Sequence, residues 1–474
     1  MRHFDLVIIG TGSGNSIAGP AFEHLDIAIL EKGAFGGTCL NVGCIPTKMY
    51  VHPADLADGA RRAGELGVDA HVDRVRWTDI RDRIFRRIDA IEAGGREYRT
   101  GERTPNITVY TGTAKFLDAR TIDTGTGETI TADRIVVAAG GRPTLPDVAG
   151  LSDPAGYGPG HRLHTSDTIM RIDELPKSLV VLGGGYIAAE FAHVFASFGT
   201  QVTQLVRSDR LLRSQDAEVS AAFTAAADRR YDVRTHAGLT KVVESETGVR
   251  VEFDSPEGPQ TVEADLVLVA IGRTPNSDLL DVAAAGLDTH ADGRLIVDEY
   301  QRTSVPGIWA LGDISSDYAL KHVANHEAKV VAHNLQHPDD LIRTDHRFVP
   351  AAVFTDPQIA SVGLTEEQAK ARQLRYVTKV QNYGDIAAGW AREDSTNFAK
   401  VIADPATGLI LGAHIIGPEA ATVIQPFIQA MSLGQTVAEV ARGQYWIHPA
   451  LSELVENALL GLELDAEIPD LLPR

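Results

Sequence analysis

Cysteine and long apolar runs are almost missing from this sequence of 474 residues. It contains two cysteines, too few for the disulfide framework that holds small secreted domains together. It has no run of about 18 apolar residues, the length that a transmembrane helix needs. Its first residues, "MRHFDLVIIGTG", enter an apolar strand pattern without the basic and apolar regions of a signal peptide. We therefore expect a cytoplasmic protein without a membrane partner.

Basic residues are also fewer than acidic residues in this chain. The chain has 44 lysines and arginines against 64 aspartates and glutamates, which gives a formal net charge of −20. This balance argues against nucleic acid and acidic membranes as partners, because both bind positively charged surfaces. Hydrophobic residues at 44% and charged residues at 23% are ordinary for a globular protein. The length predicts two to four domains.

A glycine-rich turn follows the first apolar segment. "DLVIIG" predicts a buried strand, "TGSGNSIAGPAF" predicts a turn that opens a helix, and "DIAILEKG" predicts a second strand that ends at Glu31. Gly10 permits the tight turn, and Gly12 lets the backbone approach a pyrophosphate, whereas Asn15 replaces the usual third glycine. The Glu31 carboxylate can accept hydrogen bonds from ribose hydroxyls. The unit predicts a dinucleotide site; the plainer alternative is a glycine turn without a ligand.

A second unit of this kind begins near residue 179. "LVVLG" predicts a strand, "GGYIAAEFAHVFASFG" a helix, and "QVTQLVR" a strand that ends at Arg207. Gly183 and Gly185 begin its glycine turn. Arginine at this strand end, with Arg213 just beyond, favours the 2′-phosphate of NADPH over the free hydroxyl of NADH. The alternative is a solvated basic loop.

The remaining apolar segments predict an α/β protein with a separate C-terminal part. "RIVVAAGGRPTLP", "LVLVAIGRTPNS" and "GIWALGD" each predict a strand that ends in glycine. After about residue 346 the pattern changes, because "FVPAAVFTDPQIASVGLTEEQA" and "GLILGAHIIG" are typical of antiparallel strands. "AATVIQPFIQAMSLG" predicts a helix. We therefore expect a C-terminal α+β domain.

Both cysteines lie in one short stretch, "GGTCLNVGCIPTK", as Cys39 and Cys44. Cys44 stands at a predicted helix start, with Pro46 in the first turn. A helix N-terminus lowers the pKa of a thiol and stabilises its thiolate. A close pair in a reducing compartment favours redox chemistry, but two free thiols, a structural disulfide and half of a zinc site are alternatives. Zinc is poorly supported, because no further cysteine completes a set of four ligands.

Together these motifs resemble the pyridine nucleotide–disulfide oxidoreductases, the flavoprotein family that includes glutathione reductase and lipoamide dehydrogenase. The resemblance spans the whole chain. "GGTCLNVGCIPTK" is similar to the redox-active disulfide signature of the family, "GIWALGD" to a flavin-binding strand and "HPALSE" to its C-terminal motif. Within the family, "IGTGSGNS", "LKHVANHEAKVVAHN" and "ARGQYWIHPALSELVENALLGL" most resemble the mycothione reductases, which reduce the disulfide of the sugar-linked thiol mycothiol.

The resemblance implies a fold and an assembly. It implies two Rossmann-like dinucleotide-binding domains plus a C-terminal α+β dimerisation domain, in a homodimer with shared active sites. We expect a FAD-binding domain in two parts, residues 1–149 and 275–345, an NADPH-binding domain at 150–274 and the dimerisation domain at 346–474.

The resemblance also implies roles for six side chains. Electrons pass from NADPH through FAD to a Cys39–Cys44 disulfide, and Lys48 and Glu190 form an ion pair beside the flavin. Cys44 is the thiol next to the flavin, and Cys39 exchanges with a small-molecule disulfide. His448 from the other subunit, held by Glu453, serves as acid and base. We expect the contacts with FAD and NADPH among Gly10, Gly12, Ser13, Gly14, Glu31, Lys32, Gly37, Thr38, Lys48, Gly140, Gly183, Gly185, Tyr186, Ile187, Glu190, Arg207, Arg213, Gly272, Asp313 and His322.

Other enzymes of the same family, and one protein of a different class, are alternatives to this interpretation. Lipoamide dehydrogenase works with NAD and usually has an acid where Arg207 stands, and glutathione reductase needs recognition of a charged tripeptide. Mercuric reductase and the large thioredoxin reductases need a further thiol pair near the C-terminus, and no cysteine follows Cys44. A flavin-binding redox sensor without turnover is the alternative from a different class.

Four histidines, at 322, 326, 333 and 337, share one face of a predicted helix and could suggest a metal. The stretch lacks an HExxH motif, because Val330 stands where the second histidine would be. We expect no metal site, and we place His322 near the flavin.

Overall fold

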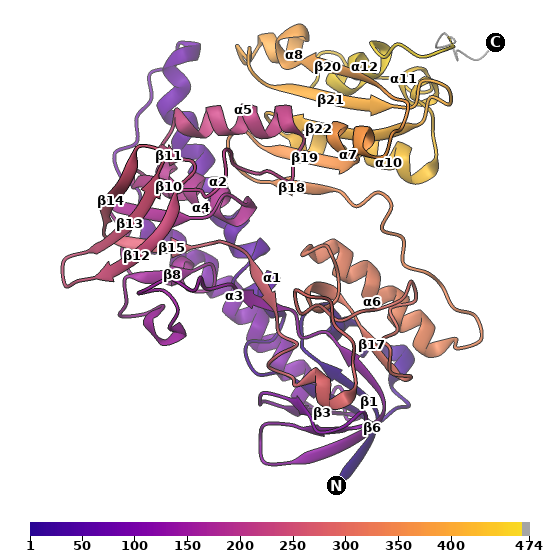
Figure 1. Cartoon of the computed structure of the whole chain (residues 1–474). Coiled ribbons are helices and arrows are strands. Elements are labelled where there is room, and N and C mark those ends of the chain that lie inside the picture. Colours follow the sequence, from indigo (N-terminus) through magenta and orange to yellow (C-terminus); the bar gives the residue numbers. More distant parts are fainter. Residues whose placement is uncertain (467–474) are drawn as a thin grey trace.

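Residues 1–466 are described by the computed structural model, and within them the chain forms five β-sheets with helices packed against them (Figure 1). The first sheet has seven strands, in the order β3-β2-β1-β6-β5-β4 with β17 paired to β6. Its central strands are parallel and rich in buried Ile, Val, Leu and Ala, as expected for a sheet covered on both faces. The strands are β1 (Arg2–Ile9), β2 (Ile27–Leu30), β3 (Ile107–Tyr110), β4 (Lys115–Phe116), β5 (Thr121–Asp123), β6 (Thr129–Val137) and β17 (Ile308–Ala310).

The helix predicted after the first glycine turn is absent, and that prediction was wrong. Short 3-10 turns at Ser13–Ser16 and Pro20–Phe22 stand in its place. Pro20 has no N–H for a helical hydrogen bond, and Gly19 before it is extended. The Arg99 guanidinium donates to the backbone oxygens of Asn15 and Ala18 at 2.7 Å each, and so satisfies carbonyls that a helix would have paired.

The second dinucleotide-type unit has the predicted strand, helix and strand. Its five-stranded parallel sheet has the order β11-β10-β9-β15-β8. The bounds are β8 (Leu163–Thr165), β9 (Ser178–Leu182), α4 (Tyr186–Ser197), β10 (Gln201–Leu205), α5 (Ala217–Asp228), β11 (Asp232–Arg234) and β15 (Leu266–Val269). A three-stranded antiparallel sheet joins it through β12 (Gly238–Glu244), β13 (Val249–Ser255) and β14 (Gly258–Ala264). A two-stranded ribbon pairs β7 (Gly141–Pro143) with β16 (Arg273–Pro275).

The C-terminal part is an antiparallel sheet with helices, as predicted, in the order β18-β19-β22-β21-β20. The helix expected over "AATVIQPFIQAMSLG" is divided in two, with Ile424 between its parts and a proline in the first turn of the second. The bounds are β18 (Ala351–Val353), β19 (Ile359–Gly363), α7 (Glu366–Ala371), β20 (Val377–Asn382), α8 (Ala387–Trp390), β21 (Phe398–Ala403), β22 (Ile410–Ile416), α9 (Ala420–Val423), α10 (Gln425–Leu433), α11 (Val437–Arg442) and α12 (Glu453–Leu460).

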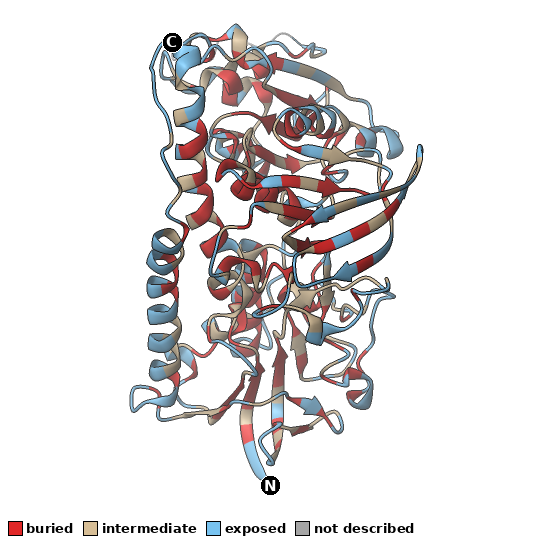
Figure 2. Cartoon of the chain, turned by 90° about the vertical axis from the view of Figure 1, so that its left-hand side faces the viewer, coloured by how far each residue is buried: buried red, intermediate tan, exposed pale blue. Residues whose placement is uncertain are grey.

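Four further helices lie against these sheets: α1 (Gly37–Asn41), α2 (Cys44–Arg62), α3 (Trp77–Thr100) and α6 (Lys321–Gln336). Helix α2 packs against α4 and so connects the first and second sheet regions. Buried residues are concentrated in the strands and on the inner faces of the helices (Figure 2). Within residues 1–466 no helix is long and apolar enough to cross a membrane. The division at 149, 274 and 345 stays a prediction, and residues 467–474 of its last segment lie outside the described residues.

Candidate functional site

A cavity of about 1220 Å³ opens between the first sheet, the second sheet and the C-terminal part. Parallel strands bring their carboxyl ends and the following loops to one edge, where such folds bind ligands. Ligand pockets of drug-sized molecules measure about 300–1,000 Å³, so this cavity has the size for a longer molecule such as a dinucleotide. The expected site residues that line it are Gly10, Gly12, Ser13, Glu31, Lys32, Gly37, Thr38, Cys39, Cys44, Lys48, Gly140, Gly185, Tyr186, Ile187, Glu190, Asp313 and His322.

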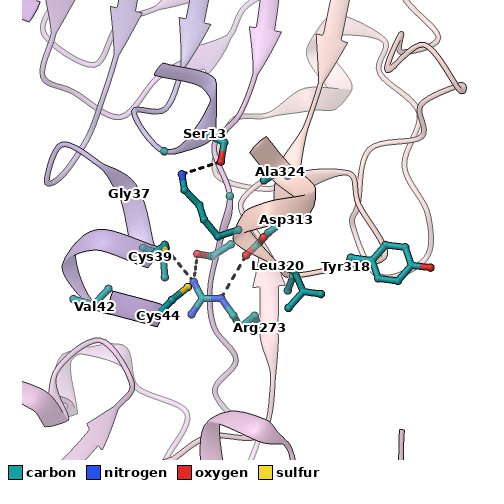
Figure 3. Close-up of a pocket in the computed structure, with 18 of the residues that line it drawn as sticks. Ser13, Gly37, Cys39, Val42, Cys44, Arg273, Asp313, Tyr318, Leu320 and Ala324 are labelled. Atoms are coloured by element: carbon teal, nitrogen blue, oxygen red, sulfur yellow. Dashed lines mark hydrogen bonds and ion pairs between the residues drawn. The ribbon is translucent and has the colours of Figure 1, made fainter. Parts of the chain in front are cut away.

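The two cysteines meet in this cavity (Figure 3). Cys39 lies in α1 and Cys44 begins α2, and Gly43 between the helices has no room for a side chain, because a Cβ there would lie 2.9 Å from the Thr38 oxygen. Both cysteines are free thiols in this structure. A hydrogen bond from Cys39, together with the nearby Lys48 ammonium, lowers the pKa of Cys44 to about 7. The same contact with Cys44, together with burial, raises the pKa of Cys39.

Lys48 and Glu190 lie next to the cysteines and form an ion pair. Lys48 Nζ donates to both carboxylate oxygens of Glu190, at 2.8 and 2.6 Å. The Phe354 backbone N–H donates to Glu190 Oε1 at 3.0 Å, and Lys48 Nζ lies 4.8 Å from the centre of the Phe354 ring. Glu190 is buried, so its charge depends on these partners. Helices α2 and α4 therefore each contribute one charge to a fixed pair.

The first glycine turn leaves its backbone open to the cavity. A Cβ on Gly10, whose φ is +104°, would lie 2.4 Å from the Ala138 oxygen, and a Cβ on Gly14 would lie 2.5 Å from the Ala138 methyl group. Gly14 therefore lets this turn pack closely against Ala138, a role that the third glycine of the usual motif has in other proteins. Glu31 Oε2 accepts from the Thr11 N–H at 2.8 Å and from its hydroxyl at 2.6 Å. The bare turn with a carboxylate at the next strand end fits the pyrophosphate and ribose of FAD.

Arg273 is a site residue that the sequence analysis missed. It follows Gly272 and is the first residue of β16. Its side chain lies 3.9 Å from Asp313 (Figure 3) and 3.8 Å from Asp167. Burial raises the pKa of Asp313 and of Asp167, against the opposing effect of the arginine. The buried Nε of Arg273 makes no hydrogen bond with any described residue. A buried donor of this kind calls for an acceptor, and the oxygen-rich chain of FAD supplies acceptors. The signal in the sequence was the arginine that follows glycine in both "GGRPT" and "IGRTP".

The second glycine turn is built in the same way. A Cβ on Gly183, whose φ is +128°, would lie 2.3 Å from the Ala270 oxygen, whereas a Cβ on Gly185 would meet nothing within 4 Å. Tyr186, the first residue of α4, lines the cavity, and the partial burial of its ring there raises the pKa of its hydroxyl to about 12, so the hydroxyl stays protonated. Arg207 and Arg213 lie outside the cavity lining, are exposed and form no ion pair with a described residue. Unpaired guanidinium groups beyond this turn fit a 2′-phosphate.

Two expected glycines belong to backbone turns around the cavity. Gly140, with φ of +62°, accepts a hydrogen bond from the Asn276 N–H at 3.0 Å. Gly272, with φ of +143°, accepts from the Thr144 N–H at 3.0 Å and does not line the cavity. These left-handed conformations favour glycine. The two hydrogen bonds join the segments on either side of the β7–β16 ribbon.

His448 and Glu453 form a pair away from the cysteines of their own chain. His448 Nδ1 lies 2.7 Å from Glu453 Oε1, and neither residue lines the cavity. The His448 side chain is 71% exposed, and the nearby apolar side chains of Tyr445 and Ile447 are also exposed. Large apolar groups around an exposed polar pair are typical of an interface.

The four histidines that the sequence places on one helix face make hydrogen bonds and a ring contact. His322 lines the cavity, and its Nε2 lies 2.9 Å from the Pro350 oxygen. His326 accepts from the Asp345 N–H, and His333 Nε2 lies 2.9 Å from the Asp340 oxygen. The ring of His337 lies against that of His333, with ring centres 4.5 Å apart and planes tilted by 31°. Among residues 1–466 no group of three or more His, Cys, Asp or Glu side chains is placed to hold a metal ion.

Comparisons with known proteins agree with this geometry. Residues 4–328 match the family model for pyridine nucleotide-disulphide oxidoreductases, and residues 349–459 match the dimerisation domain of that family. The chain is 53% identical over 471 residues to mycothione reductase of Mycobacterium tuberculosis, covering 98% of this chain and 100% of that protein. It is 32% identical over 462 residues to dihydrolipoyl dehydrogenase of Geobacillus stearothermophilus, covering 96% and 95%. The HOCl-induced flavoprotein disulfide reductase RclA of Escherichia coli has a TM-score of 0.83 at 25% identity, covering 96% of this chain and 99% of RclA.

Proposed function

The chain belongs to the pyridine nucleotide-disulphide oxidoreductase family, and from this premise we propose that it reduces mycothione, the disulfide of mycothiol. The broader activity is plain: the protein is an NADPH-dependent flavoprotein disulfide oxidoreductase that uses FAD and NADPH. FAD, when bound, supplies two-electron transfer between a nicotinamide and a dithiol. The following steps concern what the residues of this chain do.

Cys39 and Cys44 carry the exchange with the substrate in our proposal. The Cys39 thiolate attacks one sulfur of the substrate disulfide, so that a mixed disulfide forms and one substrate thiol leaves with a proton. Cys44, whose pKa of about 7 keeps much of it as thiolate at neutral pH, then attacks Cys39. This second attack releases the other substrate thiol and forms a Cys39–Cys44 disulfide. Two electrons are thus delivered per substrate molecule, and two thiols are produced.

Lys48 and Glu190 hold a fixed charge pair beside this dithiol. The carboxylate is held by three hydrogen bonds, two from Lys48 and one from the Phe354 backbone. In our proposal Glu190 holds the Lys48 ammonium near Cys44. The positive charge of Lys48 then lowers the pKa of that thiol.

His448 supplies the proton transfer in our proposal, and it acts on the cysteines of the other subunit. Its exposed position and its absence from the lining of its own cavity support this arrangement. The dimerisation-domain match over residues 349–459, which includes His448 and Glu453, supports a homodimer. Glu453 accepts from one ring nitrogen of His448 and leaves the other free to take the Cys39 proton and return it to the departing thiol.

Mycothione is favoured as the substrate by one observation above all. The 53% identity to a mycothione reductase extends over nearly the whole length of both chains, against 32% for the dihydrolipoyl dehydrogenase. Two exposed arginines, Arg207 and Arg213, lie near the second glycine turn and count against a lipoamide dehydrogenase, because they favour NADPH over NADH.

We also propose a cytoplasmic location, since a reducing compartment keeps such a dithiol active. Cell fractionation tests this location.

A substrate panel tests the proposed function. The purified flavoprotein is given NADPH with mycothione, glutathione disulfide or lipoamide in parallel, and NADH replaces NADPH in a second series. We expect kcat/KM to be highest for mycothione with NADPH. Preference for lipoamide with NADH would instead identify a lipoamide dehydrogenase. Efficient turnover of glutathione disulfide with NADPH would identify a glutathione reductase.

A further inference from the structure

The turn that carries Asp313, one of the expected FAD contacts, begins without a cap from its own sequence. This 3-10 turn, Gly312–Ile314, follows Leu311, whose side chain has no oxygen to accept from the first free N–H groups. The N–H of Gly312 donates instead to Glu327 Oε2 at 2.7 Å. Glu327 lies in α6, 15 positions further along the chain. A distant side chain therefore caps the turn.

The turn and α6 approach each other closely. Gly312 has a φ of +74°, and a Cβ there would lie 3.4 Å from the Ala324 methyl group. Gly312, Asp313 and Ala324 line the cavity, whereas Glu327 is fully buried and does not line it. Glu327 can therefore act on a ligand in the cavity only through the turn.

The other carboxylate oxygen of Glu327 faces a histidine. His346 Nε2 lies 3.0 Å from Glu327 Oε1, without the alignment of a hydrogen bond, and attracts the carboxylate when the imidazole is protonated. A buried carboxylate needs such a partner for its charge. The His346 ring also lies 5.5 Å from the ring of Tyr318, centre to centre, and Tyr318 lines the cavity. The two oxygens of Glu327 thus have separate partners, the turn and His346.

His346 belongs to residues 337–350, the linking segment that leads from α6 to β18 in the C-terminal part (Figure 1). Helix α6 holds this segment at several points. Asn334 Nδ2 donates to the Ile342 oxygen at 3.0 Å, Asn334 Oδ1 accepts from the Ile342 N–H at 2.9 Å, and three histidines of α6 make the contacts described above. Glu327 contacts this segment and the turn at once, so it joins the linking segment to the wall of the cavity.

We propose that Glu327 is a positioning residue for FAD. Its Oε2 fixes the Gly312 N–H and so holds the Asp313 carboxylate at the cofactor site. The contact is a hydrogen bond to a neutral N–H, so the reach of the side chain decides the effect rather than its charge. The inference rests on the use of FAD by this family and not on the proposed substrate.

Exchange of bound FAD for added isotope-labelled FAD in the folded holoenzyme tests this role. Glu327→Asp keeps the charge but is shorter by one methylene, so it withdraws the acceptor from the Gly312 N–H. Because a hydrogen bond to a charged group is worth about a factor of ten or more, we expect FAD to exchange at least about tenfold faster. Glu327→Gln keeps the reach and an acceptor oxygen, and its exchange rate should stay within about threefold of the parent rate.

Asn334→Leu is the matched control, because Asn334 is buried in the same helix and bonds the same linking segment but does not line the cavity. It should lower Tm and leave FAD exchange within about twofold of the parent rate. A folded Glu327→Asp protein that retains no FAD, beside a Glu327→Gln protein that does, would support the proposal as well.

An unchanged exchange rate in Glu327→Asp would overturn the proposal. An equal acceleration in Glu327→Gln would also overturn it, because charge and not reach would then matter. The same acceleration in Asn334→Leu would show a general loosening of α6 instead. A failure to reduce mycothione would overturn the proposed substrate and would leave this result intact.

Discussion

At the scale of single residues, the cysteine pair is asymmetric although both thiols share one short loop. Cys44 begins α2 and receives a hydrogen bond from Cys39, which lowers its pKa to about 7. Cys39 is the donor in that bond, so its own ionisation is disfavoured. The first proton therefore leaves Cys44, and the dithiol gains its first negative charge as the pH rises through about 7. This asymmetry suits the separate roles that we propose for the two sulfurs.

The reduced enzyme should show the ionisation of Cys44 near pH 7. Below that pH Cys44 is protonated and slow to alkylate, and above it the thiolate is formed. Cys39→Ala removes the hydrogen-bond donor and should raise the midpoint, whereas Cys39→Ser keeps a hydroxyl donor and should raise it less. The measurement is the alkylation rate of Cys44 against pH, read by mass spectrometry. Equal midpoints in the two variants would show that the Cys39 hydrogen bond does not cause the shift.

At the scale of elements, glycines decide how β9 connects to α4. Gly183→Ala would place a methyl group 2.3 Å from the Ala270 oxygen at a φ that alanine avoids. We expect a loss of several degrees in Tm or failure to fold. Gly185→Ala meets no atom within 4 Å, so Tm should be unchanged, but the methyl faces the cavity and should raise KM for NADPH at least about tenfold. Thermal unfolding and NADPH kinetics separate the two effects, and an unchanged KM would remove Gly185 from the NADPH contacts.

A buried lysine ties α5 to the C-terminal sheet. Lys400 on β21 contacts Asp216 at 3.1 Å, and Glu218 and Glu366 complete the cluster. Burial alone would raise the pKa of Asp216, but hydrogen bonds from the Glu366 N–H and from Lys400 outweigh it, and the pKa is lowered. Because Asp216 precedes α5 and follows the loop that carries Arg213, the cluster also supports the second glycine-turn region.

Lys400→Met should destabilise the protein by about 3–5 kcal/mol, because it leaves Asp216 charged and buried without its partner. Arg375→Met is the control, since its pair with Asp465 is exposed and worth about 1 kcal/mol or less. The depressed pKa of Asp216 means that its contribution is present above the ordinary value of 3.8 and is lost as the pH falls through the folded-state pKa. The Tm difference between the parent enzyme and Lys400→Met should therefore narrow in acid. A difference that stays constant with pH would contradict this account.

At the scale of the whole molecule, the proposed function assigns the exposed His448–Glu453 pair of one chain to the cysteines of the other chain, and mixed dimers test this assignment. Dimers that combine a Cys39→Ala chain with a His448→Ala chain would contain one site with both defects and one intact site, if the sites are shared. We expect about half of the parent activity from such dimers, whereas each homodimer should lose about 10²–10⁴-fold or more. The measurement is NADPH oxidation by tagged, purified mixed dimers.

Dimers of the parent chain with a doubly substituted chain are the control. Shared sites predict that they are nearly inactive, because the defects then fall on both sites. Sites formed within one chain predict the opposite result for both kinds of mixed dimer.

Several elements of this protein could be predicted from the sequence because their cause is local. The strand, glycine turn and helix from 179 to 197, the start of α2 at Cys44 and the change to antiparallel strands after 346 follow from short-range patterns. The prediction of a helix after Gly10 was wrong. Pro20 interrupts the segment, and Arg99, distant in sequence, donates to carbonyl oxygens that a helix would have paired. The apolar pattern alone could not show that competing partner.

By itself, the sequence determined which chemical groups this protein has: one cysteine pair beside a glycine, two glycine turns, and a histidine five residues before a glutamate. Only the tertiary structure decided which groups meet. It brings Lys48 to Glu190 across 142 positions, Arg273 between Asp167 and Asp313, and Lys321 to Ser13 above the cysteines. The physical reason is that the burial of apolar strands and helices drives the chain to fold, and the fold brings these distant polar groups together. Burial also strengthens the interactions of each charge and makes an unpaired charge costly.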